Sequence, residues 1–348
     1  MKQVNKLSPA RPEWSIAQSR DVVGAMKLLC SGLILIFSPL IAHNPERAAS
    51  LPYISGDTFR HFCDHVFDET KLDLDLSKIK TGDTIFVKTC FLEYFFTLYA
   101  PKIKTKYILV THNSDKTSLT KANINDLHNS TNLIAWFGVN PGNLKHPKFF
   151  PIPIGLANRR WEHGNIDNLN QVRQILGFDN NNYSNSSTSA VAKNLNLELK
   201  KYLACLNFSL TTGGPRAEAY QAFANQSWCK VFLNNNHQGF VDHKTYLTNM
   251  SESKFVICPF GHGLDTHRTW EALLVGCYPV VLSSALDQLY TDLPVVIVNS
   301  WAAVTQEFLE AQYNLLQAKS AANKFKWEKL YFAYWANLIR QVQAKIRS

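Results

Sequence analysis

The sequence lacks the cysteine pattern of a disulfide-rich or zinc-binding protein. Its seven cysteines form no close pairs, and their odd number leaves at least one without a partner inside the chain. No CxxC pair offers neighbouring thiolate ligands. The sequence therefore indicates no disulfide framework, and we expect no metal cofactor.

A long, uninterrupted apolar run is also missing. The segment 22–42 is apolar except for Lys27, and its clean part, 28–42, is shorter than the roughly 20 residues of a membrane-spanning helix. Because Lys27 can snorkel and basic residues precede it, we expect a single-pass signal anchor within an N-terminal segment, 1–50. A cleaved signal peptide or a buried helix would give a secreted or cytoplasmic protein instead.

The motifs of nucleic-acid-binding domains are absent, although the formal net charge is +9. We find no zinc finger, aromatic ribonucleoprotein motif or basic zipper. Much of the excess lies near the two ends, where basic residues greatly outnumber acidic ones. This distribution suits an anionic membrane surface at least as well as a nucleic acid, and because the motifs are absent we expect no nucleic-acid partner.

The length and composition predict two packed α/β domains. A chain of 348 residues exceeds one average domain, and 46% hydrophobic residues suffice for real cores. A polar stretch of turn-forming residues, 179–189, marks a linker. We therefore expect a first domain at 51–178, a second at 190–304 and a C-terminal helical segment at 305–348. That last segment is interpreted as a helix packed on a domain, with a membrane-lying helix as the alternative.

Both predicted domains alternate strand and helix patterns. In the first, 84–89, 106–111, 133–140 and 149–156 have the pattern of strands, with an apolar stretch of helical length at 90–103. In the second, strands are expected at 201–211, 229–234, 254–259, 279–282 and 294–298, and helices at 215–226 and 266–276. This alternation predicts parallel sheets.

The segment 258–281, CPFGHGLDTHRTWEALLVGCYPVV, combines a strand end, a glycine-bearing loop and a helix start. Gly261 and Gly263 allow an anion to approach backbone amides at the positive end of the helix, where Asp265 or Thr266 is the expected N-cap. Arg268 in the first turn can bind phosphate, and Glu271 can accept hydrogen bonds from hydroxyls. An ordinary ion pair between Arg268 and Glu271 on an exposed helix is the alternative.

The whole segment resembles the exostosin-like glycosyltransferases or a close sister family. The matching positions are Phe255, Pro259, Gly261, Thr266, Arg268, Glu271, Ala272, Gly276, Cys277, Pro279 and Val280. The resemblance implies two Rossmann-like domains facing a cleft (the GT-B fold), a nucleotide-sugar donor held mainly by the second domain, and no required metal. Asp265-Thr266 and the continuation at 285–294 depart from the family pattern. These departures leave the transferred sugar and the linkage open.

A further donor-binding candidate, Arg216, follows the turn Gly213-Gly214-Pro215. It lies at the edge of the sheet where open parallel sheets bind ligands. In the resembling enzymes a basic residue here meets the diphosphate, and a plain helix-surface arginine is the alternative.

The first domain supplies candidates for the acceptor side. His112 and Asp115 follow a predicted strand directly and are candidates for the catalytic base, with an Asx turn as the alternative. Asn158, Trp161 and His163 follow the strand-like segment 149–156 and are candidates for acceptor binding, with packing between domains as the alternative.

Two further patterns are interpreted as structural. Asp73-Leu74-Asp75 matches a metal-binding DxD, but the alternation around it shows a polar face more simply. His61 and His65 flank Cys63 at helical spacing and have no evident third ligand.

Together these patterns predict an inverting transferase that moves a hexosyl or pentosyl group from a nucleoside-diphosphate sugar to a glycan or glycolipid, as in polysaccharide biosynthesis. A nucleotide-sugar epimerase and a non-catalytic glycan-binding module are the alternatives.

Overall fold

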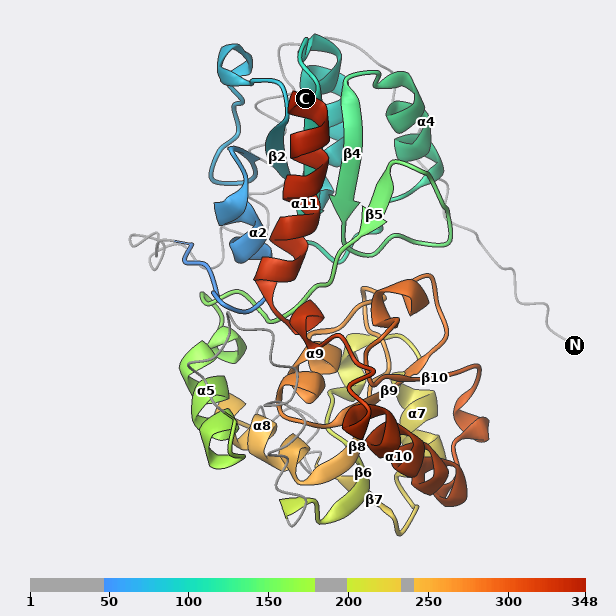
Figure 1. Cartoon of the computed structure of the whole chain (residues 1–348). Helices are drawn as coiled ribbons and strands as arrows, with labels where there is room; N and C mark the ends of the chain where they lie inside the picture. Colours follow the sequence, from blue (N-terminus) through green and yellow to red (C-terminus); the bar gives the residue numbers. More distant parts are fainter. Residues whose placement is uncertain (1–46, 179–198, 233–240) are drawn as a thin grey trace, which may run out of the picture. The chain divides into compact units, whose positions relative to one another are not determined.

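The computed structural model describes residues 47–178, 199–232 and 241–348 (Figure 1). The predicted anchor, 22–42, and the predicted linker, 179–189, lie outside these residues. Residues Arg47–Ser348 form one compact unit. Among the described residues no helix is both long and apolar enough to span a bilayer.

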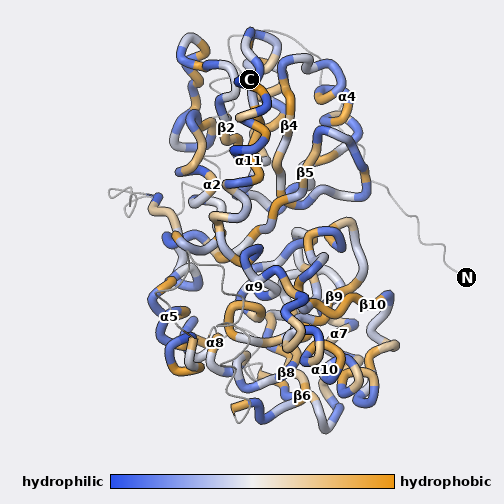
Figure 2. The backbone as a smooth tube through the Cα atoms, in the orientation of Figure 1, coloured by the Kyte–Doolittle hydropathy of each residue, from blue (hydrophilic) through white to orange (hydrophobic). Residues whose placement is uncertain are grey.

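The first sheet has five parallel strands in sequential order. These are β1 (His65–Phe67), β2 (Asp83–Lys88), β3 (Tyr107–His112), β4 (Leu133–Gly138) and β5 (Phe149–Pro151). Every residue of β3 is buried, as expected for a parallel strand covered on both faces. Figure 2 shows the apolar character concentrated along strands such as β4. The prediction of a parallel sheet here is confirmed, and β1 is a strand that the sequence pattern did not indicate.

Short helices accompany this sheet: α2 (Gly56–Phe62), α3 (Leu92–Tyr94) and α4 (Lys121–Asn129). A further short helix, α5 (Ile166–Ile175), follows β5 in the chain. The single helix expected over 90–103 is a chain of short turns, with a π-helical turn at Phe95–Tyr99 and a 3-10 turn at Ala100–Lys102. Pro101 lies in that last turn, and its fixed ring cannot continue an α-helix from the preceding turn.

The second sheet also has five parallel strands, in the order β10-β9-β8-β6-β7. The strands are β6 (Tyr202–Leu206), β7 (Cys229–Val231), β8 (Ser253–Ile257), β9 (Tyr278–Leu282) and β10 (Val296–Val298). Three helices connect them: α7 (Arg216–Phe223), α8 (His243–Ser251) and α9 (His267–Leu274). The order changes direction at β6, and such a switch point is where open parallel sheets place their ligands. Two parallel sheets agree with the predicted pair of Rossmann-like domains.

Contacts made by two helices cross the predicted domain limits. Helix α5, which the sequence assigned to the first domain, packs against α8 of the second, and buried Arg173 of α5 donates to the carbonyl of Leu274 in α9. The C-terminal segment contains α10 (Gln306–Ala321) and α11 (Phe332–Arg347). Helix α11 runs alongside the first sheet (Figure 1), because Phe332 packs on Phe59 and Gln343 donates to the carbonyl of Gly82. The interpretation of this segment as a packed helix is therefore confirmed.

Candidate functional site

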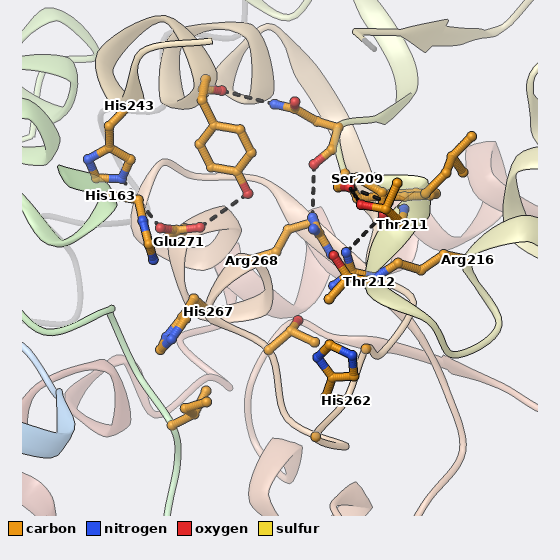
Figure 3. A pocket seen from close by; sticks show the side chains of 18 of the residues that line it. His163, Ser209, Thr211, Thr212, Arg216, His243, His262, His267, Arg268 and Glu271 are labelled. Atoms are coloured by element: carbon orange, nitrogen blue, oxygen red, sulfur yellow. Dashed lines mark hydrogen bonds and ion pairs between the residues drawn. The ribbon is translucent and has the colours of Figure 1, made fainter. Parts of the chain in front are cut away.

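A cavity of about 680 Å³ opens at the carboxyl ends of β6 and β8. Figure 3 shows its polar side chains in two groups, with the arginines on one side and several histidines with Glu271 on the other. The lining is formed by residues 207–212, 216, 232, 241, 243, 246, 261–263, 265–268 and 271, together with 115, 154, 162 and 163 from the first half of the chain. The cavity therefore contains most of the residues that the sequence singled out for donor binding.

The glycine loop after β8 is shaped by close contacts. A Cβ at Gly261 would stand 2.8 Å from Nη2 of Arg216, and one at Gly214 would stand 2.6 Å from the carbonyl oxygen of Phe260. Gly214 also has a φ of +67°, which an L side chain rarely adopts. The two glycine-containing turns thus lie directly against each other and leave room for the Arg216 guanidinium.

Arg216 and Arg268 are both buried and both donate to backbone carbonyls. Arg216 donates to the carbonyl of Ser209 at 2.9 Å, and Arg268 donates to that of Asn207 at 2.9 Å. Burial and the neighbouring charge of Arg268 lower the pKa of Arg216 to about 10. Two buried cations that repel each other create a positive electrostatic potential, which attracts an anion.

Glu271 bonds to α8 rather than to Arg268. Its Oε1 lies 3.4 Å from Nε2 of His243, and its Oε2 accepts a hydrogen bond from the Tyr246 hydroxyl at 3.1 Å. Burial alone would raise the pKa of this carboxyl. The hydrogen bond from His243 and the nearby positive groups outweigh burial, so the pKa of Glu271 is lowered. The surface ion pair considered from the sequence is replaced by a buried carboxylate that stays ionised.

Asp265 is held by the protein itself, although it reaches the cavity wall. Its carboxylate accepts hydrogen bonds from the amide of Ile154 at 2.7 Å, from Nε1 of Trp270 at 3.0 Å and from the amide of Thr266 at 2.9 Å. Burial raises the pKa of Asp265 to about 6. The N-cap of α9 is Thr266, without a side-chain cap bond. The role of Asp265 in donor binding stays a prediction.

His112 lies outside the cavity lining, contrary to its expected catalytic position. Its Nδ1 accepts from the amide of Asn113 at 2.7 Å, and its Nε2 lies 3.3 Å from the carbonyl oxygen of Pro153. Burial lowers the pKa of His112 to about 4, so the ring is neutral near pH 7. Both ring nitrogens are engaged within the protein, which leaves neither for a substrate hydroxyl.

The other candidates from the first half of the chain differ in whether they line the cavity. Asp115 and His163 line the cavity, as expected. Asn158 is buried outside it, where its Oδ1 accepts from the amide of Asp57 and its Nδ2 donates to Asn113. Trp161 is 52% exposed and stacks on His163 at the margin of the lining. The roles of Asp115, Trp161 and His163 in acceptor chemistry stay predictions.

Sequence reasoning missed four cavity residues that carry chemistry: His243, Tyr246, His262 and His267. His262 and His267 fall inside the segment already identified, so their proximity to Arg268 was a usable signal. His243 and Tyr246 lie on α8, in a stretch without glycine or motif, and only the tertiary fold brings them to Glu271.

The two metal-like patterns have structural partners. Asp75 caps a 3-10 turn through the amide of Ser77, and His65 pairs with Asp83 at 2.8 Å. Within the described residues no group of three His, Cys, Asp or Glu side chains is placed to hold a metal ion.

Of the comparisons with known proteins, only the one with solved structures gives matches, 24 chains in all. No family model matches the chain, so membership of the exostosin-like family stays a prediction, and no curated protein matches it. Among solved structures, one described as "Crystal structure of GtfA/B complex" is similar at 12% identity with a TM-score of 0.39, over 77% of this chain and 59% of that chain. Another, an alpha-glucosyltransferase in complex with UDP-glucose and DNA containing an abasic site, is similar at 9% identity with a TM-score of 0.26, over 71% of this chain and 73% of that chain. The chain thus spans 59% of the first of these two proteins. Likeness at this level leaves the functional argument to the geometry of the cavity.

Proposed function

We propose that the protein is a glycosyltransferase that moves a hexosyl or pentosyl group from a nucleoside-diphosphate sugar to a hydroxyl of a glycan or glycolipid. The observation that carries the proposal is the pair of buried arginines, Arg216 and Arg268, which face one cavity and donate to carbonyls rather than to carboxylates. A diphosphate supplies the negative charge that such a pair attracts.

The arginine side of the cavity suits a departing diphosphate. The hydroxyls of Thr211 and Thr212 line the same wall, and the α9 N-terminus directs its dipole toward it. When the bond between sugar and phosphate breaks, negative charge develops on the phosphate oxygens. Preorganised donors in a water-poor site stabilise that charge more than water does.

The opposite side suits a sugar or ribose. The ionised carboxylate of Glu271 can accept only, so it pairs with ligand hydroxyls and repels phosphate. The volume of about 680 Å³ lies within the range of roughly 300–1,000 Å³ typical of small-molecule sites. An anion next to several hydroxyls describes a nucleotide sugar better than it describes inorganic phosphate.

Two parts of the proposal concern features outside this cavity. The segment 22–42 serves as a membrane anchor, and basic residues near both ends associate with an anionic surface. The reaction needs neither a metal nor another cofactor, since the two arginines supply the cationic charge that a metal would otherwise bring.

A donor panel tests the proposal directly. Thermal unfolding is followed with UDP- and GDP-sugars, because a ligand at one hundred times its Kd adds roughly 2.7 kcal/mol to stability. We expect one donor class to stabilise the wild-type protein and not Arg268→Ala, with Arg159→Ala as a control on an exposed arginine outside the lining.

The outcomes separate the alternatives. Transfer that needs a second sugar supports the proposal, and turnover of donor alone shows an epimerase. Glycan binding without turnover shows a binding module. If no sugar nucleotide stabilises the protein or is consumed, the proposal is wrong.

A further inference from the structure

Transfer to a hydroxyl requires a group that accepts its proton, and this requirement rests on the proposed function. His112 does not meet it, because its nitrogens are engaged and the ring lies outside the cavity lining. Four other histidines line the cavity: His163, His243, His262 and His267. Two of them, His243 and His267, make side-chain hydrogen bonds that differ in the nitrogen used.

His267 has a fixed tautomer. Its Nδ1 lies 2.7 Å from the carbonyl oxygen of Gly155. A carbonyl oxygen can only accept a hydrogen bond, so Nδ1 carries the proton and Nε2 of the neutral ring carries a lone pair. By contrast, Nε2 of His243 is already turned to Glu271.

The carbonyl that fixes His267 is itself held rigidly. Gly155 has a φ of +63°, and a Cβ there would stand 2.3 Å from the carbonyl oxygen of Ile54. The next residue, Leu156, donates its amide to that same oxygen at 2.8 Å. The imidazole is therefore oriented by a backbone segment that has little freedom to move.

The position of His267 suits chemistry at the sugar. It begins α9, directly before Arg268, and lies one turn before Glu271 on the same helix face. Figure 3 shows His267 beside the group formed by His163, His243 and Glu271 and apart from Arg216. A donor with its diphosphate on the arginines and its hydroxyls on Glu271 brings its sugar close to His267.

We propose that His267 is the catalytic base of the transfer. The acceptor hydroxyl gives its proton to Nε2 of His267, and its oxygen forms a bond to the anomeric carbon of the donor. The bond from that carbon to the phosphate oxygen breaks, and its electron pair leaves on the diphosphate held by Arg216 and Arg268. The imidazolium keeps its Nδ1–H bond to Gly155 and later releases the new proton to solvent.

This single displacement sets the stereochemistry. The acceptor attacks from the side opposite the leaving diphosphate, so the anomeric configuration inverts and an α-linked donor gives a β-linked product. This mechanism requires the base and the diphosphate site to act on opposite faces of the sugar.

His267→Asn is the sharpest variant. Asparagine keeps an N–H group at the position of Nδ1, which can still donate to Gly155, and has no counterpart of Nε2. We expect donor Kd to change less than about threefold, while kcat falls by about 10²- to 10⁴-fold, the usual size of general base catalysis. His163→Asn is the rival variant, for which we expect a change in acceptor KM with kcat largely kept.

A pH profile supplies a readout that a structural role would not give. In the wild type, kcat falls on the acid side as Nε2 is protonated, and in His267→Asn that limb disappears. The ionisable groups that act on His267 are His112, His163, Asp265, Glu271 and Arg268. His267→Asn keeps all five and is compared directly with the wild type, whereas His163→Asn removes one of them and serves as the rival test.

The results distinguish this inference from the proposed function. Normal kcat in His267→Asn, loss of the acid limb only in His163→Asn, or a product of retained configuration overturns the assignment of His267 while leaving a transferase. A wild-type protein that neither binds nor consumes sugar nucleotides overturns the proposed function itself.

Discussion

The carboxyl edges of the two sheets are built from the same parallel architecture and differ in how their polar groups are used. At the first edge, Asp57 accepts from Arg47 and from Asn113, and Asn113 in turn accepts from Asn158. At the second edge, Arg216 and Arg268 face a cavity with carbonyls as their partners.

This difference shows where a ligand belongs. Charges at the first edge are neutralised inside the protein, so that edge contributes stability. The two arginines at the second edge donate to backbone carbonyls and to no carboxylate within the described residues, and keeping two like charges buried costs stability that an anionic ligand can offset. The change of strand direction at β6 points to the same edge, because the first sheet has its strands in sequential order.

The largest expected effect is on the second edge. Arg268→Ala removes a buried cation from the proposed diphosphate site, so we expect a loss of about 2–4 kcal/mol in donor binding, or roughly 30- to 1,000-fold in Kd. Isothermal titration with the best donor of the panel measures it. A Kd within threefold of the wild-type value would show that the buried arginine at the second edge does not bind the donor.

A change at the first edge is expected to act on stability instead. Asn113→Ala removes hydrogen bonds with Asp57 and Asn158 and places alanine at a φ of 63°. We expect the free energy of unfolding to fall by about 1–3 kcal/mol in denaturant titrations, with donor Kd unchanged. Asn113→Gly is the matched control, because it removes the same bonds without the backbone strain, and its loss should be smaller.

A smaller effect tests the contact between the glycine loop and Arg216. An alanine Cβ at 261 would stand 2.8 Å from Nη2 of Arg216 and must displace the end of that side chain. We expect Gly261→Ala to weaken donor binding by about 1 kcal/mol in the wild type and by nothing measurable in an Arg216→Ala background. Equal losses in both backgrounds would show that the glycine acts independently of the arginine.

The smallest effect is a pair of opposite pH dependences. The pKa of His112 is lowered from 6.5 to about 4, so its contribution to stability is present above pH 6.5 and is lost as pH falls toward 4. The pKa of Asp265 is raised from 3.8 to about 6, so stability gains from its protonation as pH falls from 6 toward 3.8. On acidification from pH 6.5 to 4, His112→Gln should therefore lose less stability than the wild type, and Asp265→Asn should lose more. The reverse order would contradict these assignments.

The success of sequence reasoning depended on how locally each feature is encoded. Arg268 and Glu271 lie three residues apart on one short helix, and the strand, glycine loop and helix around them are continuous in the chain, so their cavity position followed from the pattern. The parallel sheets followed from apolar strands alternating with helical stretches in the same way.

Features formed by segments that are distant in the sequence could not be predicted from it. His112 ends a strand as expected, but its burial depends on α2, where Gly56 allows an approach so close that a Cβ would stand 2.4 Å from Nδ1 of His112. Asp57 and Asn113 are 56 residues apart. Likewise, His243 reaches Glu271 only because α8 and α9 pack together. No local pattern distinguishes a histidine that a distant helix covers from one that lines a cavity.

Helix α11 has a consequence for biosynthesis. The first sheet is complete in strands once residue 151 has been made, yet Phe59 and Phe62 pack against Phe332, and Asp83 pairs with Arg347. During synthesis the first half of the chain therefore lacks its contacts with α11, and part of its apolar surface stays uncovered, until the whole second sheet has been translated. The half that is translated first thus obtains its last native contacts only after the C-terminal helix has been made.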